Sequence, residues 1–316
     1  MQLYHEDANA TREELLSGLL APRASTSPKF LYDALGSKLF EAITELDEYY
    51  PTRVEATIFA AHAAAMAERI GRIDTLVDLG AGNCAKASRV LQWLRPQRYV
   101  AVDISVAFLR DALRQVQRTH PSLDIVGLGM DFSATLHLPA DAVTGRPLYF
   151  YPGSSLGNFT PAQALGFLRE LRTRAEGGGL LVGIDLVKPA AVLDAAYDDA
   201  LGVTAAFDLN LLRHLNRVVG ADFDPRQWRH IGRYNAAESR VEMHLEAREA
   251  LTVHWPGGER RFAAGEHIHT ENSYKYTPGA FADLLREAGF GPARRWSDER
   301  DWFAVYYAPA GDAAGA

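Results

Sequence analysis

The chain has 316 residues, of which 47% are hydrophobic and 23% charged, a globular balance that allows one large domain or two smaller ones. Its net charge of -7 argues against nucleic-acid binding, and its single cysteine, Cys84, excludes an intramolecular disulfide. The N-terminal sequence MQLYHEDANATREE lacks the apolar core of a signal peptide, and no window is uninterruptedly apolar over the ~18 residues of a membrane span. These features predict a cytoplasmic protein without a membrane or nucleic-acid partner.

Hydrophobic periodicity predicts the elements in chain order. Helices are expected at 11–20 and 38–47, then a break at 48–53, where Pro51 disfavours helical geometry at Tyr50, and then a helix over 53–70. From there strands alternate with helices. The strands are expected at 76–78, 99–104, 124–131, 147–152 and 180–187, and the helices at 106–118, 161–175 and from 86 onward. This alternation predicts an α/β fold with a parallel, doubly wound sheet.

The pattern changes after residue 187. Helical stretches at 192–201 and 209–219 are followed by polar, alternating strands at 240–247, 250–255 and 261–262. A helix at 278–288 and strands at 293–297 and 302–307 then resume the earlier pattern. We therefore expect a first domain of residues 54–187 and 275–316, and a second, substrate-binding domain of residues 1–53 and 188–274.

Residues 75–91, TLVDLGAGNCAKASRVL, indicate a ligand site. A buried strand ends at Asp78, Gly80 and Gly82 form a turn, and a helical pattern begins at Lys86. Such a turn is expected to present free backbone N–H groups and a helix N-terminus to a nucleotide-like ligand. The D-x-G-x-G pattern resembles the first motif of class I S-adenosylmethionine-dependent methyltransferases. A nicotinamide dehydrogenase is the alternative, because it shares the glycines, but it leaves Asp78 without a role.

Polar residues at two further strand ends extend this site, because doubly wound sheets bind ligands there. Asp103 is expected to accept hydrogen bonds from ribose hydroxyls; its alternative role is a helix N-cap, for which Ser105 is better placed. Asp131 and Phe132 suit the adenine base, and Lys86 either meets the donor's carboxylate or lies in solvent. The ten histidines show no metal-ligand spacing, so no metal is expected.

Five segments together resemble one family. They are YDALGS at 32–37, EYYPTR at 48–53, GSSLGNFTP at 153–161, DLVK at 185–188 and AYDDALGVTAAF at 196–207. The family is the L-histidine Nα-methyltransferases of ergothioneine biosynthesis. The resemblance implies a class I, Rossmann-like methyltransferase sheet that closes in an antiparallel hairpin, with a second substrate-binding domain. It also implies that three methyl groups pass from S-adenosylmethionine to free L-histidine, giving hercynine and S-adenosylhomocysteine. We expect a monomer.

The resemblance further implies a role for individual residues. Asn158 and Tyr197 hold the substrate carboxylate, and Gly153 opens the loop beside them. Tyr32 lies near the α-amine, so Tyr32 and Asn158 are the catalytic candidates. The remaining substrate-binding candidates, mostly on the imidazole side, are Tyr49, Thr204, Phe207, Met243, Glu271 and Ser273. The candidates for donor binding are Asp78, Gly80, Gly82, Lys86, Asp103, Asp131 and Phe132.

Two other readings of these residues stay open. The same fold could methylate another aromatic amino acid such as tryptophan, although the acidic Glu271 and the hydroxyl of Ser273 suit imidazole better. A protein that only senses the methyl donor would not need Asn158, Tyr197 and Glu271.

Overall fold

The computed structural model describes residues 2–3, 8–133 and 136–311, so a few positions of both expected domains lie outside the described residues. The chain folds into two compact units. Unit 1 comprises Met1–His5, Pro51–Val187 and Lys275–Ala316, and unit 2 comprises Glu6–Tyr50 and Lys188–Tyr274. Over the described ranges, the structure contains no helix that is both long and apolar enough to cross a membrane.

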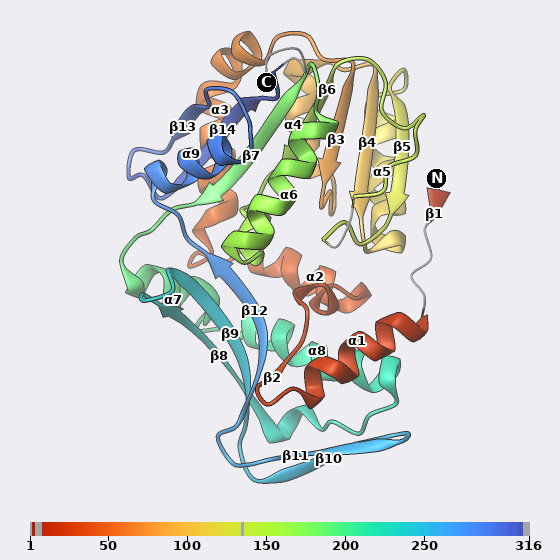
Figure 1. Ribbon diagram of the computed structural model, residues 1–316, viewed down its shortest axis with the longest axis vertical. Helices are drawn as coiled ribbons and strands as arrows, with labels where there is room; N and C mark the ends of the chain where they lie inside the picture. Colours follow the sequence, from red (N-terminus) through yellow and green to blue (C-terminus); the bar gives the residue numbers. More distant parts are fainter. Residues whose placement is uncertain (1, 4–7, 134–135, 312–316) are drawn as a thin grey trace. The chain divides into compact units, whose positions relative to one another are not determined.

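Unit 1 is built on an eight-stranded sheet with the order β1-β5-β4-β3-β6-β7-β14-β13 (Figure 1). The strands are β1 (Gln2–Leu3), β3 (Thr75–Leu79), β4 (Arg98–Asp103), β5 (Asp124–Gly129), β6 (Pro147–Tyr151), β7 (Gly179–Asp185), β13 (Arg294–Ser297) and β14 (Phe303–Pro309). All neighbouring strands are parallel except β14, which runs antiparallel to both β7 and β13. The predicted class I methyltransferase sheet with its closing antiparallel hairpin is thereby confirmed.

Helices cover both faces of this sheet. They are α3 (Tyr50–Ile70), α4 (Ala85–Leu94), α5 (Val106–Thr119), α6 (Pro161–Arg174) and α9 (Pro278–Glu287), with a 3₁₀ turn η2 (Ser155–Asn158). On one face, buried residues of α3, α4 and α5 join a single apolar cluster with the strands. On the other face, Tyr151 packs edge-on against Phe167 of α6. Helix α6 lies in front of the sheet in Figure 1. Coverage on both sides explains why β3, β6 and β7 are buried at every position.

Unit 2 combines helices with a second, four-stranded sheet of order β2-β12-β9-β8. Its helices are α1 (Ala8–Leu20), α2 (Ala34–Thr44), α7 (Ala190–Tyr197) and α8 (Val203–Val219), with 3₁₀ turns η1 (Pro28–Leu31) and η3 (Pro225–Gln227). Its strands are β2 (Ala24–Ser25), β8 (Trp228–Asn235), β9 (Arg240–Ala247) and β12 (His267–Tyr274), and a separate hairpin pairs β10 (Leu251–Trp255) with β11 (Gly258–Phe262). The sequence pattern did not predict β8 and β12.

Several predicted helix boundaries are wrong, among them the helices expected at 38–47 and 192–201, which span 34–44 and 190–197. Two further differences have local reasons. The break expected over 48–53 is shorter, because α3 already begins at Tyr50. Pro51 lies in its first turn, where a missing N–H breaks no helical hydrogen bond. Helix α8 begins at Val203 rather than 209. The carboxylate of Asp199 accepts the N–H groups of Val203 at 3.0 Å and Thr204 at 2.7 Å, which satisfies donors that a helix start leaves unpaired.

Candidate active site

The glycine turn after β3 offers space rather than hydrogen-bond donors. Gly80 and Gly82 adopt φ of +71° and +52°, where a side chain would be strained. The N–H groups of Gly80 and Ala81 donate to the carbonyl of Val102, and that of Gly82 donates to Asp103 at 2.8 Å. The expectation of free N–H groups is therefore wrong for these three residues. A Cβ added at Gly82 would meet no heavy atom within 4 Å beyond its chain neighbours, so a ligand can approach the backbone closely.

Asp78 is the most perturbed carboxyl at this turn. Its side chain is buried, Oδ2 accepts a hydrogen bond from Tyr99 Oη at 2.8 Å, and Oδ1 is buried without a hydrogen-bond partner among the described residues. Desolvation raises the pKa of Asp78 to about 7, and the nearby Asp103 adds to this shift. A buried carboxylate oxygen with unused acceptor capacity fits a cationic ligand such as a sulfonium with an ammonium group.

Asp103 lies where β4 ends and uses both carboxylate oxygens. Oδ2 accepts the Gly82 N–H and Oδ1 accepts the Ser105 N–H, each at 2.8 Å. Ser105 is the N-cap of α5, but its side chain makes no capping hydrogen bond. Burial raises the pKa of Asp103 despite these N–H donors. A carboxylate oxygen can accept more than one hydrogen bond. Asp103 can therefore accept further hydrogen bonds from hydroxyl groups while it holds the N–H groups of Gly82 and Ser105.

Asp131 and Phe132 follow β5, next to the glycine turn. Asp131 accepts hydrogen bonds from the N–H and the hydroxyl of Ser133, at 2.8 and 2.5 Å. The ring of Phe132 packs against Tyr151, with ring centroids 5.8 Å apart. A Cβ added at Gly80 would lie 3.8 Å from Phe132, so the ring borders the turn. The structure thus brings Phe132 to the donor-site candidates around Gly80.

Lys86 is not a solvated helix residue. Its ammonium pairs with the buried carboxylate of Glu55 on α3, with 2.7 Å between Nζ and Oε2. The other oxygen of Glu55 accepts the N–H of Gly153 at 2.8 Å, so Glu55 joins α3, α4 and the loop after β6. Glu55 was not among the residues predicted from the sequence, although an acidic residue close to the mostly apolar run at 56–61 of α3 is a signal for a buried, paired charge.

In unit 2, the residues predicted to contact the imidazole ring lie on one face of the sheet. Glu271 pairs directly with Met243 across β12 and β9, and Ser273 pairs with Val241. Directly paired residues point to the same face, and all four are buried. Tyr197, the last residue of α7, reaches this face, and its hydroxyl donates to Ser273 Oγ at 2.8 Å. Four predicted residues, Tyr197, Met243, Glu271 and Ser273, are therefore gathered in one buried patch.

An aromatic cluster in unit 2 contains three more candidates. Tyr32 packs edge-on against Phe207 of α8 and Phe40 of α2, with ring centroids 5.4 and 5.5 Å apart. The ring centroid of Tyr49 lies 6.1 Å from that of Phe40 and 6.2 Å from that of Tyr197. Thr204 is buried one turn before Phe207 on the same helix, and Asp199 holds its N–H. Ring contacts therefore connect Tyr32 to Tyr49 through Phe40. Tyr49 in turn contacts Tyr197, which belongs to the buried patch.

Residues 11–310 match the sequence profile of the family described as "Histidine-specific methyltransferase, SAM-dependent". The chain belongs to this family. It is 40% identical to the histidine N-alpha-methyltransferase of Mycolicibacterium smegmatis, over 96% of this chain and 93% of that protein. It is 30% identical to ergothioneine biosynthesis protein 1 of Neurospora crassa, over 84% of this chain but 31% of that protein. Among solved structures, the CcbJ methyltransferase from Streptomyces caelestis matches with a TM-score of 0.46 and 16% identity, covering 80% of this chain and 90% of that one.

Membership of this methyltransferase family decides against a nicotinamide dehydrogenase. The loop after β6 carries the two remaining candidates, Gly153 and Asn158. Ser154 between them has φ of +62°, and its hydroxyl accepts the N–H of Asp185 at 2.9 Å. Asn158 is half-buried at the end of η2. The loop is therefore fixed from both sides, by Glu55 at Gly153 and by Asp185 at Ser154.

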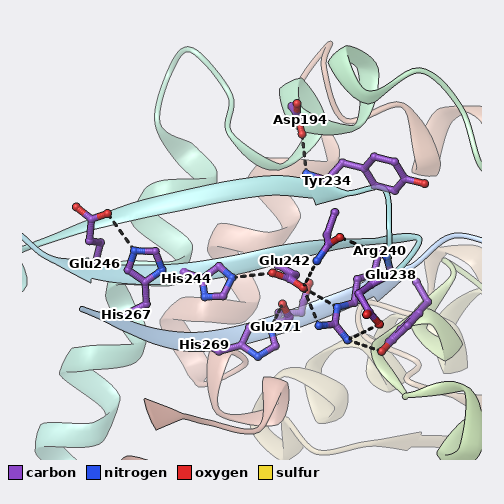
Figure 2. A network of polar contacts seen from close by, with 12 residues as sticks. Asp194, Tyr234, Glu238, Arg240, Glu242, His244, Glu246, His267, His269 and Glu271 are labelled. Atoms are coloured by element: carbon purple, nitrogen blue, oxygen red, sulfur yellow. Dashed lines mark hydrogen bonds and ion pairs between the residues drawn. The ribbon is translucent and has the colours of Figure 1, made fainter. Parts of the chain in front are cut away.

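The opposite face of the sheet in unit 2 carries a polar network instead (Figure 2). His244 stacks on His269 with ring centroids 4.8 Å apart and lies 5.2 Å from His267. Glu242 accepts from His244 at 3.2 Å, and Glu246 accepts from His267 at 3.0 Å (Figure 2). No spacing in the sequence groups these histidines. Within the described ranges, no group of three or more histidine, cysteine, aspartate or glutamate residues has the geometry to hold a metal ion.

Proposed function

We propose that this protein transfers three methyl groups in succession from S-adenosylmethionine to the α-amine of free L-histidine, giving hercynine as the first step of ergothioneine biosynthesis. The observation that carries the proposal is the buried patch of Glu271, Ser273, Met243 and Tyr197 on one face of the sheet in unit 2. A carboxylate and a hydroxyl beside an apolar thioether match the N–H groups and the flat ring of imidazole.

Glu271 supplies discrimination between amino acids in this proposal. Its buried carboxylate accepts a ring N–H of histidine, whereas an all-carbon ring leaves it without that partner. A lost hydrogen bond to a charged group costs ~1.5–3 kcal/mol, which disfavours substrates such as phenylalanine. Tyr197 has one hydroxyl proton, so it donates either to Ser273 or to a substrate carboxylate at any one time.

The donor-site residues fit S-adenosylmethionine, which when bound supplies an electrophilic methyl group on its sulfonium. The carboxylate of Asp78 attracts the positive charge of the sulfonium and ammonium groups through its oxygen without a hydrogen-bond partner. The carboxylate of Asp103 accepts hydrogen bonds from the ribose hydroxyls. The amine of histidine must be neutral to react, and burial favours its neutral form. Tyr32 lies near this amine, and Asn158 orients the carboxylate beside it. Holding distance and angle in this way lowers the barrier by several kcal/mol.

The test is mass spectrometry of free amino acids incubated with the purified protein and S-adenosylmethionine. We expect histidine to gain one, two and three methyl groups, and to accumulate as the trimethylated product. The same reaction in EDTA should proceed at an unchanged rate, because we expect no metal. Product from tryptophan in preference to histidine would contradict the substrate assignment. Accumulation of the monomethylated form alone would contradict the trimethylation.

A further inference from the structure

The carbonyl group of Tyr197 has a dedicated partner inside unit 2. As the last residue of α7, Tyr197 has a carbonyl that no helical N–H can reach. His230 of β8 supplies the donor, with 2.8 Å between Nε2 and the Tyr197 oxygen. The other ring nitrogen, Nδ1, lies 2.7 Å from Oδ2 of Asp208 on α8. The side chains of His230 and Asp208 are 1% and 0% exposed, so water does not compete for either contact.

These two contacts define the protonation of His230. A carbonyl oxygen only accepts hydrogen bonds, and so does an ionised carboxylate. A neutral imidazole has one N–H, whereas both nitrogens of His230 face an acceptor. Both contacts are satisfied together when the ring carries both protons, as an imidazolium paired with Asp208. Burial opposes this charge, but the hydrogen bond and the charge of Asp208 outweigh it and raise the pKa of His230, with Asp198 adding to the shift.

The backbone at Gly232 packs closely against the same carbonyl. A Cβ added at Gly232 would lie 2.2 Å from the oxygen of Tyr197 and 3.1 Å from Nε2 of His230. The end of α7 thus rests directly on β8, where only glycine leaves room. A positive ring at a helix C-terminus is also favoured by the negative end of the helix dipole.

We propose that His230 is a positioning residue for substrate binding: by holding the carbonyl of Tyr197, it sets the Tyr197 side chain against Ser273 and the substrate. The proposal rests on the proposed role of Tyr197 in binding histidine. Asp208 keeps the ring doubly protonated and correctly turned. Neither His230 nor Asp208 belongs to the residues that the family resemblance assigns to the substrate.

Two amide substitutions separate this role from a purely structural one. In His230→Gln the side-chain amide reaches the position of Nε2 and can still donate to the Tyr197 carbonyl. In His230→Asn the shorter amide reaches only the position of Nδ1, beside Asp208. Both variants remove the positive charge next to Asp208, so they form a matched pair. A second control, Asp208→Asn, lets a neutral His230 accept at Nδ1 from the new amide while Nε2 still donates to Tyr197.

The measurement is KM and kcat for histidine in each variant, together with the dissociation constant for S-adenosylmethionine. We expect His230→Asn to raise KM for histidine about tenfold, the effect of one lost buried hydrogen bond. His230→Gln and Asp208→Asn should stay within about threefold of the wild type. Donor affinity should be unchanged in all three.

Equal KM values for the two His230 variants would overturn the inference. If either fails to fold, Asp208→Asn decides, because a large rise in its KM would assign the effect to the ion pair and not to the Tyr197 carbonyl. A wild-type protein that does not methylate histidine would instead contradict the proposed function, and with it the premise of this inference.

Discussion

Asp78 combines three properties at one residue: complete burial, one hydrogen bond from Tyr99, and an oxygen without a hydrogen-bond partner in the described part of the chain. Desolvation raises the pKa of its carboxyl to about 7, so near neutral pH the unliganded protein holds this group in both protonation states. A bound cation favours the ionised form and lowers this pKa. Binding of the methyl donor is then coupled to the release of a proton.

We therefore predict that donor affinity depends on pH. Below a pH of about 7 the affinity for S-adenosylmethionine should fall, approaching tenfold per pH unit, and above it the affinity should level off. Asp78→Asn, which cannot ionise, should bind the donor more weakly at high pH and lose most of the slope. Calorimetry over this pH range measures both. A wild-type affinity that is flat through pH 7 would remove Asp78 from the donor site.

At the residue scale, the sequence predicted the members of the donor turn but not the groups that control them. Asp78, Gly80 and Gly82 stand in one short motif, so their proximity follows from chain connectivity. Tyr99 and Glu55 reach the site from β4 and α3, and only the tertiary fold brings them to Asp78 and Lys86. No local pattern marks Tyr99 as a partner of Asp78.

At the scale of elements, the pairing of β12 explains why this strand was not predicted from the sequence. Its pairing with β9 is interrupted between His269 and Glu271, which leaves Thr270 as an extra residue. Strict alternation would put His269 on the face of Glu271 and Ser273. With the bulge, Ile268 shares that face instead, and His269 joins the polar network opposite (Figure 2). Two consecutive buried residues, Thr270 and Glu271, therefore break the period-two pattern that predicts strands.

The loop after β6 offers a prediction with a matched control. Gly153 and Gly177 have similar positive φ, +78° and +73°, so alanine should strain both backbones about equally, by roughly 1 kcal/mol. An added Cβ at Gly153 would lie 2.7 Å from Nζ of Lys86, whereas at Gly177 it would meet nothing within 4 Å. Gly153→Ala should lose at least as much stability in urea as Gly177→Ala, because it also displaces Lys86 from the buried Glu55, and only Gly153→Ala should weaken donor binding. Equal donor affinities in the two variants would show that Lys86 does not belong to the donor site.

At the scale of the whole molecule, alternating strands and helices were enough to predict the sheet of unit 1, because its central strands are continuous apolar runs. The closing antiparallel hairpin was expected only through the family resemblance, and the strand order was not predicted. The edge pairing of β1 with β5 is a contact between residues distant in sequence, and Gln2–Leu3 carry no signal for it. The sheet of unit 2 was predicted in part, since β9 alternates regularly between buried and half-buried residues.

Two residues contribute different parts of recognition in the proposed function. Asn158 is proposed to bind the carboxylate that all amino acids share, whereas Glu271 is proposed to bind the imidazole. Loss of Asn158 should therefore weaken every substrate alike, and loss of Glu271 should penalise histidine selectively. Glu242, an acidic residue on the opposite face of the same sheet, provides a matched control for Glu271.

The most direct measurement is kcat/KM for histidine and for tryptophan in the wild type, Glu271→Ala, Asn158→Ala and Glu242→Ala. A buried hydrogen bond to a charged group accounts for about ten- to a hundredfold in kcat/KM, so Glu271→Ala should lower the histidine value by that factor and leave tryptophan nearly unchanged. Asn158→Ala should lower both substrates, and Glu242→Ala should preserve the histidine-to-tryptophan ratio. An equal loss for both substrates in Glu271→Ala would contradict the assignment of Glu271 as the residue that selects histidine.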